Sequence, residues 1–334
     1  MDATTIQDLA GDGSIEKTDF PEFRSPMLAT LTKNFFDDPD WIYERKLDGM
    51  RCLVYMVNGS PHLYSRNGKK ANARFPELTE AMNSLSTRDF VIDGEIVAFE
   101  GKVTSFKKLQ KRMQVADSEK ARSIGVKTYL YIFDLLYFDG YALHDLPLVQ
   151  RKQLLKRNFD WNEKVPLRYT PHRREKGQKF HKEACNKGWE GIIAKDGTST
   201  YRHTRSRKWL KFKCVNGQEL VIGGFTEPQG DRKGFGALLV GFYEGEKLQY
   251  AGKVGTGFSD EFLKEWRTNF DEIEQSDSPF SNYEDDNGGQ NHWVAPDYVG
   301  QFEFTEWTDS NKLRHPSFVG IRDDKDPKAV KKEM

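Results

Sequence analysis

Short apolar runs bounded by turn residues fill the chain up to about residue 216, and they predict a mixed α+β domain. The apolar residues of 41–57 are interrupted at 46–49, which predicts a hairpin of two strands with Lys46 at the start of its turn. Further strands are expected at residues 62–64, 90–99, 129–137, 189–195 and 208–213, and residues 90–99 are expected to be a strand pair that turns at Asp93-Gly94-Glu95. Helices are expected at residues 75–85, 146–159 and 179–187.

After residue 216 the pattern changes to short strands at turn-bounded spacing, expected at residues 220–225, 237–243, 247–254 and 298–304. One helix interrupts them at residues 259–270, with Ser259 as its N-cap. This set is typical of a small β-barrel of the oligonucleotide-binding (OB) type. Residues 275–292 are rich in Asp, Asn, Gly and Ser and are expected to be a surface loop. We therefore predict a flexible tail at 1–20, a first domain at 21–216 and an OB-fold domain at 217–334.

The composition is typical of a soluble protein with two cores: 334 residues, 37% apolar and 13% aromatic. No apolar run approaches the roughly 20 residues that span a bilayer, and residues 1–20 are polar, so we expect no membrane partner and a cytoplasmic location. The net charge is zero, yet residues 217–334 hold 13 basic and 23 acidic side chains, against 38 and 28 in residues 1–216. A positive first domain suits a polyanion such as nucleic acid.

The three cysteines, Cys52, Cys185 and Cys214, are odd in number and widely spaced, without a Cys-x-x-Cys pair. This spacing supports neither a disulfide framework nor a zinc site. We expect three buried or bystander thiols.

Candidate chemistry begins with Lys46, whose amine has an ordinary pKa of about 10.4 and becomes a nucleophile only when positive neighbours or desolvation favour its neutral form. Other basic residues are therefore expected to converge on it. Asp48 can hold a ribose hydroxyl or a metal-bound water, Gly49 lets the backbone approach a ligand, and Arg51 can pair with anionic oxygens. Glu95 lies between apolar residues, and a buried carboxylate needs a partner or a metal.

Seven short stretches occur in an order that resembles one enzyme superfamily. They are Lys46-Leu47-Asp48-Gly49-Met50-Arg51, Ser65-Arg66-Asn67-Gly68, Asp93-Gly94-Glu95, Phe133-Asp134, Glu190-Gly191, Lys211-Phe212-Lys213 and Arg322-Asp323-Asp324-Lys325. The set resembles the covalent nucleotidyltransferases, and in particular the ATP-dependent DNA ligases found as the ligase module of bacterial end-joining proteins. The similarity covers about residues 22–326, including Arg-Phe-Pro-Glu-Leu at 74–78 and Leu-Arg-His-Pro-Ser-Phe at 313–318.

The resemblance implies a nucleotidyltransferase (adenylation) domain followed by an OB-fold domain, acting as a monomer on nicked double-stranded DNA in repair, recombination or replication. ATP would be the cofactor, with Mg²⁺ or Mn²⁺. Lys46 would take AMP from ATP as a phosphoramidate and pass it to the 5′-phosphate at a nick, where the neighbouring 3′-hydroxyl would displace it. By the same resemblance, Lys211 and Lys213 would contact the α-phosphate and lower the pKa of Lys46, while Glu95 and Glu190 would bind the divalent ion or the ribose.

The resemblance also assigns residues to the nucleoside. Phe133 would stack on adenine and Glu44 would lie by its amino edge, while Arg51 and Arg66 would hold ribose or phosphate oxygens, Arg66 being a candidate for the 5′-phosphate of the nick.

Arg322 and Lys325 lie far along the chain from Lys46, and the resemblance assigns both to the pyrophosphate leaving group. This requires the second domain to close for the first step, so we predict a hinge near residues 214–219. The alternatives are an RNA ligase or a guanylyl-transferring capping enzyme on the same scaffold, or a nucleic-acid-binding barrel protein without catalysis. A zinc-bearing NAD-dependent ligase is disfavoured, because the chain lacks a cysteine cluster.

Overall fold

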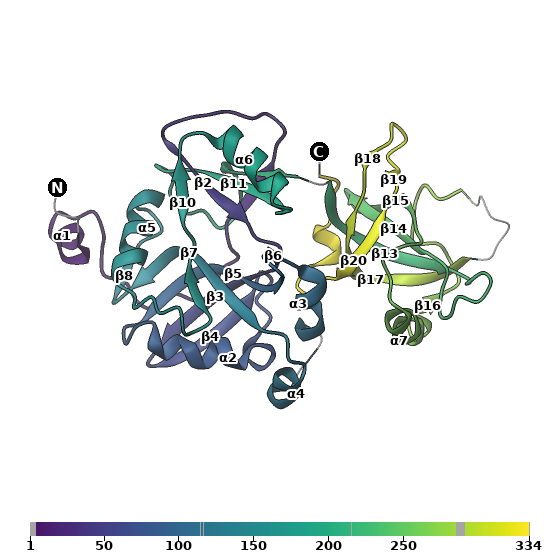
Figure 1. The fold of residues 1–334 in the computed structure, drawn as a ribbon, viewed down its shortest axis with the longest axis horizontal. Helices are drawn as coiled ribbons and strands as arrows, with labels where there is room; N and C mark the ends of the chain where they lie inside the picture. The colour runs from purple at the N-terminus through teal and green to yellow at the C-terminus, as the bar shows by residue number, and fades with distance from the viewer. Residues whose placement is uncertain (1–4, 114, 116, 215, 285–290, 334) are drawn as a thin grey trace. The chain divides into compact units, whose positions relative to one another are not determined.

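The computed structural model describes residues 5–113, 115, 117–214, 216–284 and 291–333, and it divides the chain into two compact units, residues 1–214 and 215–334 (Figure 1). The division falls two residues before the boundary expected from the sequence. Among the helices of these described ranges, none is long and apolar enough to cross a membrane.

Two sheets build the first unit. The five-stranded sheet has the order β1-β12-β11-β2-β10, and the seven-stranded sheet has the order β4-β3-β5-β7-β8, with β6 paired to β5 and β9 paired to β7. The strands of the five-stranded sheet are β1 Leu28–Leu31, β2 Trp41–Lys46, β10 His172–Arg174, β11 Gly191–Asp196 and β12 Arg205–Lys213. Those of the seven-stranded sheet are β3 Met50–Val57, β4 Ser60–Ser65, β5 Phe90–Glu100, β6 Val103–Thr104, β7 Thr128–Phe138, β8 Tyr141–Ala142 and β9 Leu167–Tyr169.

The two sheets face each other across a buried apolar cluster. Ile42 and Trp209 of the five-stranded sheet pack in it with Leu53, Val91 and Phe133 of the seven-stranded sheet. Side chains on this inner face of the five-stranded sheet therefore point toward the other sheet, where the site described below lies.

Helices pack against both sheets. They are α2 Pro76–Ala81, α3 Phe106–Met113, α4 Ser118–Ser123, α5 Leu148–Arg157 and α6 Gly177–Asn186, with 3-10 turns at Asn72–Arg74 and Met82–Ser84. Helix α5 reaches the cluster between the sheets with Leu148. Helix α6 packs its Phe180 and Ala184 on Tyr43 and Phe212, which point to the outer face of the five-stranded sheet. The helices expected at 75–85, 146–159 and 179–187 are confirmed as α2 with its following turn, α5 and α6.

The turn at residues 46–49 does not make the expected hairpin. Strand β2 ends at Lys46 in the five-stranded sheet, and β3 begins at Met50 in the seven-stranded sheet, so the segment carries the chain from one sheet to the other. Gly49 is needed at this crossing, because a Cβ there would lie 2.1 Å from the carbonyl oxygen of Ile96. The strand pair expected at 90–99 is also wrong: β5 is one strand of 11 residues, irregular in its pairing with β7 between Asp93 and Gly94.

The expected flexible tail is wrong from residue 5 onward, while residues 1–4 lie outside the described residues. Helix α1, Ile6–Gly11, begins with a capping box between Thr5 and Asp8, and it buries Ile6 and Leu9. The reason is that two apolar residues at helical spacing are enough to dock a short capped helix, although the segment is too short to show periodicity.

The second unit is a β-barrel of the expected OB type. Its main sheet has the order β15-β14-β13-β17-β16, with β20 paired to β17, and β18 and β19 form a separate hairpin. The strands are β13 Gly217–Thr226, β14 Leu238–Glu244, β15 Lys247–Val254, β16 Glu274–Gln275, β17 Asn291–Glu303, β18 Glu306–Trp307, β19 Leu313–Arg314 and β20 Ser317–Ile321, and a 3-10 turn follows at Pro327–Ala329.

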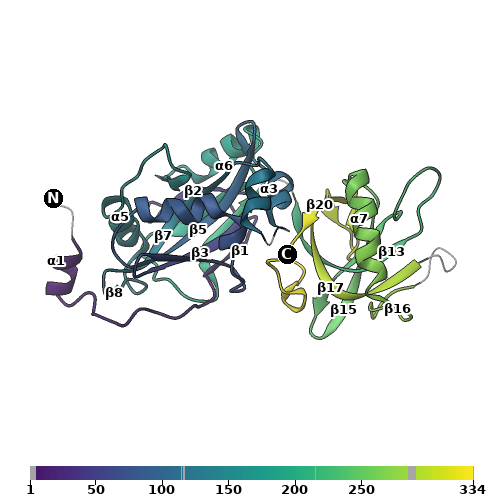
Figure 2. The ribbon, with the colours of Figure 1, turned by 90° about the horizontal axis from the view of Figure 1, so that it is seen from below.

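Helix α7, Asp260–Asp271, lies along this barrel (Figure 2). The hydroxyl of Ser259 accepts a hydrogen bond from the backbone of Phe262, which confirms Ser259 as the N-cap. The surface loop expected at 275–292 is shorter on both sides, because β16 ends at Gln275 and β17 begins at Asn291. Within it, residues 285–290 lie outside the described residues, and Phe280 is buried in the barrel core.

Candidate active site

Three neighbouring strands align the predicted lysines. Strand β11 lies between β2 and β12, and its Gly191 is opposite Lys46 on one side and Lys213 on the other. Two residues further, Ile193 is opposite Glu44 and Lys211. Directly opposite residues of antiparallel strands point to the same face, so these four side chains share the inner face of the sheet. The structure therefore brings together residues that are up to 169 positions apart in the sequence.

The amine of Lys46 forms an ion pair with Oε1 of Glu190, and the two side chains are only 18% and 25% exposed. Burial acts to lower the pKa of Lys46, but the negative charges of Glu190, Asp48 and Glu95, together with the hydrogen bond that Lys46 donates to Glu190, outweigh it and raise the pKa above its ordinary value. The expectation of a lowered pKa for Lys46 is therefore wrong. The reason is that the carboxylates around the amine dominate its electrostatics.

The backbone conformation at residue 191 explains why a glycine follows Glu190. Gly191 has φ +149°, and a Cβ at this position would lie 1.9 Å from the carbonyl oxygen of Phe212. Glycine therefore allows β11 to start close against β12, which places Glu190 beside Lys46. The second carboxylate oxygen of Glu190, Oε2, is buried and has no hydrogen-bond partner among the described residues.

Asp48 fixes the crossing segment to the next helix. Its Oδ2 accepts a hydrogen bond of 2.8 Å from the backbone N–H of Phe106, the first residue of α3, and its own N–H donates to Oγ1 of Thr104 at 3.1 Å. The ribose or metal-water role predicted for Asp48 stays a prediction, and the structure adds a positioning role.

Arg51 is held by a buried partner that the sequence interpretation did not identify. Its guanidinium donates two hydrogen bonds to Asp93, the Nη2–Oδ2 distance being 2.6 Å, and a third to the carbonyl oxygen of Met27. Tyr201 also donates to Asp93, at 2.6 Å. Burial acts to lower the pKa of Arg51, but Asp93 raises it, so the guanidinium keeps its charge.

Glu44 is buried under two lysines that were missed in the sequence. Lys152 of α5 donates a hydrogen bond to its carboxylate, and Lys195 of β11 forms an ion pair with it at 2.6 Å. Burial would raise the pKa of Glu44, but the two ammonium groups lower it. A signal existed for Lys195, because it alternates with Gly191 and Ile193 along β11 and so shares their inner face.

Phe133 lies beside the same cluster and is 7% exposed. The Arg51 guanidinium lies 4.7 Å and the Lys195 ammonium 4.1 Å from the centre of its ring. Lys195 is also 4.1 Å from the ring of Trp209. Phe133, the residue predicted to stack on adenine, thus lies between Arg51 and the cluster of Glu44 with Lys195.

The other predicted residues of the first unit lie on the seven-stranded sheet. Glu95 of β5 is directly opposite Arg51 of β3, and both are half-buried. Arg66 follows the last residue of β4, in the turn expected at Asn67-Gly68, and is half-buried. Their predicted ligand contacts stay predictions.

Arg322 and Lys325 lie in the second unit, just after β20. Arg322 is 7% exposed and forms a two-bonded ion pair with Asp324, at 2.8 Å and 2.9 Å. Lys325 forms an ion pair of 2.9 Å with Glu219. Burial would raise the pKa of Asp324, but Arg322 lowers it. The predicted pyrophosphate contact therefore requires Arg322 and Lys325 to exchange carboxylate partners for phosphate.

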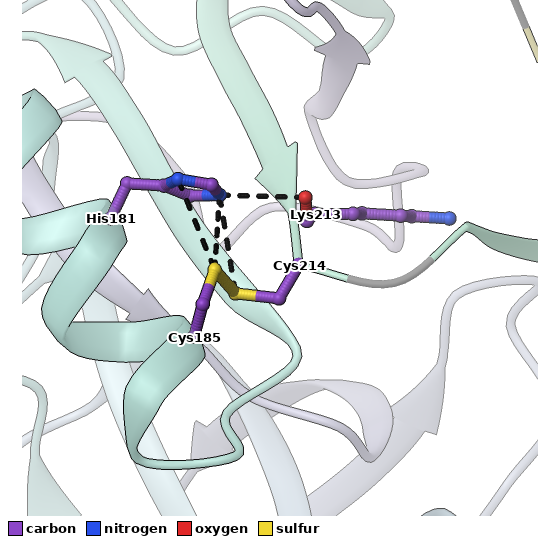
Figure 3. Close-up of a disulfide and its surroundings, with 4 residues drawn as sticks. All are labelled: His181, Cys185, Lys213 and Cys214. Atoms are coloured by element: carbon purple, nitrogen blue, oxygen red, sulfur yellow. Dashed lines mark hydrogen bonds between the residues drawn. A yellow bond between two sulfur atoms is a disulfide. The ribbon is translucent and has the colours of Figure 1, made fainter.

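Two of the three cysteines form a disulfide, so the expectation of three thiols is wrong. Cys185 lies in the last turn of α6 and Cys214 follows the last residue of β12, with 5.2 Å between their Cα atoms (Figure 3). The sequence spacing of 29 residues gave no signal, because the antiparallel pairing of β11 and β12 is what returns the chain to α6. Cys52 is a buried free thiol.

The family described as "ATP dependent DNA ligase domain" matches residues 26–213, and the one described as "ATP dependent DNA ligase C terminal region" matches residues 231–325. The multifunctional non-homologous end joining protein LigD of Pseudomonas aeruginosa is 35% identical over 323 residues, which are 94% of this chain and 37% of that protein. LigD of Mycolicibacterium smegmatis is 33% identical, over 94% of this chain and 40% of its own length. The chain thus spans about two fifths of the curated relatives it matches.

A solved structure, mycobacterial DNA ligase D complexed with ATP and MES, is 31% identical and has a TM-score of 0.66. The match covers 93% of this chain and 98% of that one.

Proposed function

Because the chain belongs to the ATP-dependent DNA ligase family, we propose that it seals nicks with a 5′-phosphate and a 3′-hydroxyl in duplex DNA, through a covalent lysyl-AMP on Lys46. The observation that carries the proposal is the shared face of β2, β11 and β12, where Lys46 lies in register with Lys213 beside Glu190. A protein that only binds DNA has no use for a buried lysine in this setting.

In the first step the neutral amine of Lys46 attacks the α-phosphorus of ATP. A P–N bond forms, the bond from the α-phosphorus to the bridging oxygen breaks, and pyrophosphate leaves. The raised pKa of Lys46 means that the amine must first give up a proton, and the Glu190 carboxylate is its ion-pair partner. Lys211 and Lys213 share the face of Lys46 and are placed to offset the phosphate charge that develops during the transfer.

A divalent ion fits this site. Within the part of the chain that the structure describes, the buried Oε2 of Glu190 lacks a hydrogen-bond partner, and a carboxylate oxygen is the ligand type that Mg²⁺ and Mn²⁺ prefer. Glu190 would hold the ion, with Glu95 as a second candidate. When bound, the ion would supply positive charge that lowers the pKa of Lys46 and neutralises phosphate oxygens.

In the later steps the AMP passes to the 5′-phosphate of the nick, and the 3′-hydroxyl displaces it to join the strands. We assign DNA binding chiefly to phosphate contacts of the first unit, since residues 1–216 carry the excess of basic side chains. A monomer, a place in DNA repair and a cytoplasmic location are parts of the same proposal.

Sealing of a nicked duplex by the wild type and by Lys46→Ala, with ATP, GTP or NAD supplied in turn, tests the proposal. We expect sealing with ATP alone, and none by Lys46→Ala. Labelling with GTP in place of ATP would favour the capping-enzyme alternative, and sealing of nicked RNA but not of DNA would favour an RNA ligase.

A further inference from the structure

The disulfide between Cys185 and Cys214 encloses the charged residues that act around Lys46. Its loop runs from the last turn of α6 through β11 and β12, and it contains Glu190, Lys211 and Lys213. Cys185 comes five residues before Glu190, and Cys214 comes one residue after Lys213. The disulfide therefore joins the two ends of the segment that carries these groups.

Short contacts connect the disulfide with the lysine nucleophile. The backbone N–H of Cys214 donates a hydrogen bond of 2.9 Å to the carbonyl oxygen of Glu190, whose carboxylate pairs with Lys46. Figure 3 shows the carbonyl oxygen of Lys213 facing His181, while the Lys213 side chain extends away from the disulfide. The Nε2–O distance between His181 and Lys213 is 3.4 Å. The position of Cys214 therefore bears on both Glu190 and Lys213.

The pair also has the surroundings of an exchangeable disulfide. Cys185, Cys214 and His181 are all half-buried, so the surroundings of the disulfide are partly open to solvent. Nε2 of His181 lies 3.5 Å from Sγ of Cys185 and 3.9 Å from Sγ of Cys214. A protonated imidazole at this distance stabilises a thiolate, which is the species that attacks and leaves in thiol–disulfide exchange.

We propose that Cys185 and Cys214 are a reversible thiol–disulfide modification site that orders the strand end carrying Lys213 and thereby sets the rate of self-adenylation. The inference rests on the proposed function. In the reductive direction a dithiol attacks one sulfur, the Cys185–Cys214 bond breaks, and the mixed disulfide is resolved by the second thiol of the reductant. The protein gains two electrons and two protons, and the dithiol leaves as a cyclic disulfide. Oxidised glutathione reverses the change and leaves as two molecules of glutathione.

Reduction frees the end of β12 where the chain passes to the second unit. Fixing the backbone of one residue changes an equilibrium constant by about fivefold or more. We therefore expect the rate constant of self-adenylation, measured at saturating ATP, to be about fivefold lower after reduction.

The experiment compares four preparations of the full chain: wild type as purified, wild type reduced with dithiothreitol, the same protein reoxidised with oxidised glutathione, and the Cys185→Ser/Cys214→Ser variant. Each is given ATP and Mg²⁺, and the rate of adenylate formation is measured in the redox state that defines it, while the double variant is measured both with and without dithiothreitol. Thiol titration of the native protein should detect two thiols only after reduction, since Cys52 is buried. Thermal unfolding of each preparation is measured in parallel.

We expect the rate to fall on reduction and recover on reoxidation, while the double variant keeps one rate in both conditions. A disulfide that only stabilises the fold would lower the melting temperature on reduction without changing the rate at 25 °C, and that result would overturn the inference. Equal rates in all four preparations would overturn it as well. If no preparation forms an adenylate, the proposed function itself fails, so the two failures are distinguishable.

Discussion

Replacement of Glu44 by glutamine tests the buried charge cluster between the five-stranded sheet and α5. Glu44 is 2% exposed, and both Lys152 and Lys195 form ion pairs with its carboxylate. Removing one partner of a buried ion pair costs about 3–5 kcal/mol, because the remaining charges lose their compensation. In this cluster the cost depends on pH, because Lys195 can release its proton.

The pKa of Lys195 is lowered to about 8, by burial first and then by Lys152, although Glu44 acts to raise it. Without Glu44 it falls further, so Lys195 of the variant is neutral in the folded state at pH 7. In the unfolded state the protonation of Lys195 is the same in both proteins, so it cancels from the difference in unfolding free energy. Below pH 8 the folded wild type binds this proton and the folded variant does not. The difference in unfolding free energy between the two proteins therefore grows by about 1.4 kcal/mol for each pH unit below 8. The loss of unfolding free energy in Glu44→Gln should therefore be about 1.4 kcal/mol larger at pH 7 than at pH 9.

The assay is urea unfolding followed by tryptophan fluorescence at both pH values, for the wild type and Glu44→Gln. Glu80→Gln is the matched control, because Glu80 pairs with Arg122 at the surface, where both side chains are about half exposed or more. We expect the control to change little and equally at both pH values. An equal loss for Glu44→Gln at pH 7 and pH 9, or no loss at all, would refute the reasoning.

Three further predictions follow from the same structure. Arg322→Ala or Lys325→Ala should slow self-adenylation more than sealing of a preadenylated nick, and equal losses in the two assays would contradict the pyrophosphate role. Burial and then Lys152 lower the pKa of His172 to about 4, so folded-state stability should fall as the pH drops from 6.5 to 4, and His172→Asn should flatten this fall in unfolding experiments. Nick sealing should weaken about tenfold or more between 50 and 200 mM salt, while a flat response would exclude dominant phosphate contacts.

Local patterns were enough to predict many elements but not their partners. The alternation of Lys211 and Lys213 and the N-cap at Ser259 depend on nearby residues, and both are found as expected. The hairpin at Lys46 failed, because two strands joined by a short turn normally pair, whereas here β2 and β3 join different sheets. Such a choice is made by long-range packing, and the close approach of Gly49 to Ile96 is one trace of it in the sequence.

At the site, too, some residues were predictable from the sequence and others depend on long-range packing. The resemblance led to Lys46, Lys211, Lys213 and Glu190, which the register of three strands brings to one face or beside it. Lys152 and Lys195 were missed, since a lysine is normally expected in solvent and burial is accepted only with a partner such as Glu44. The disulfide was missed because it depends on two strands returning the chain to α6.

The central claim is that Lys46 carries the nucleotide. Peptide mass spectrometry after incubation with ATP and Mg²⁺ tests it most directly, with Lys46→Ala as the comparison. We expect one AMP adduct, located on the peptide that contains Lys46 and absent from the variant. An adduct on another residue, or an unmodified protein under conditions where the folded state is intact, would contradict the account.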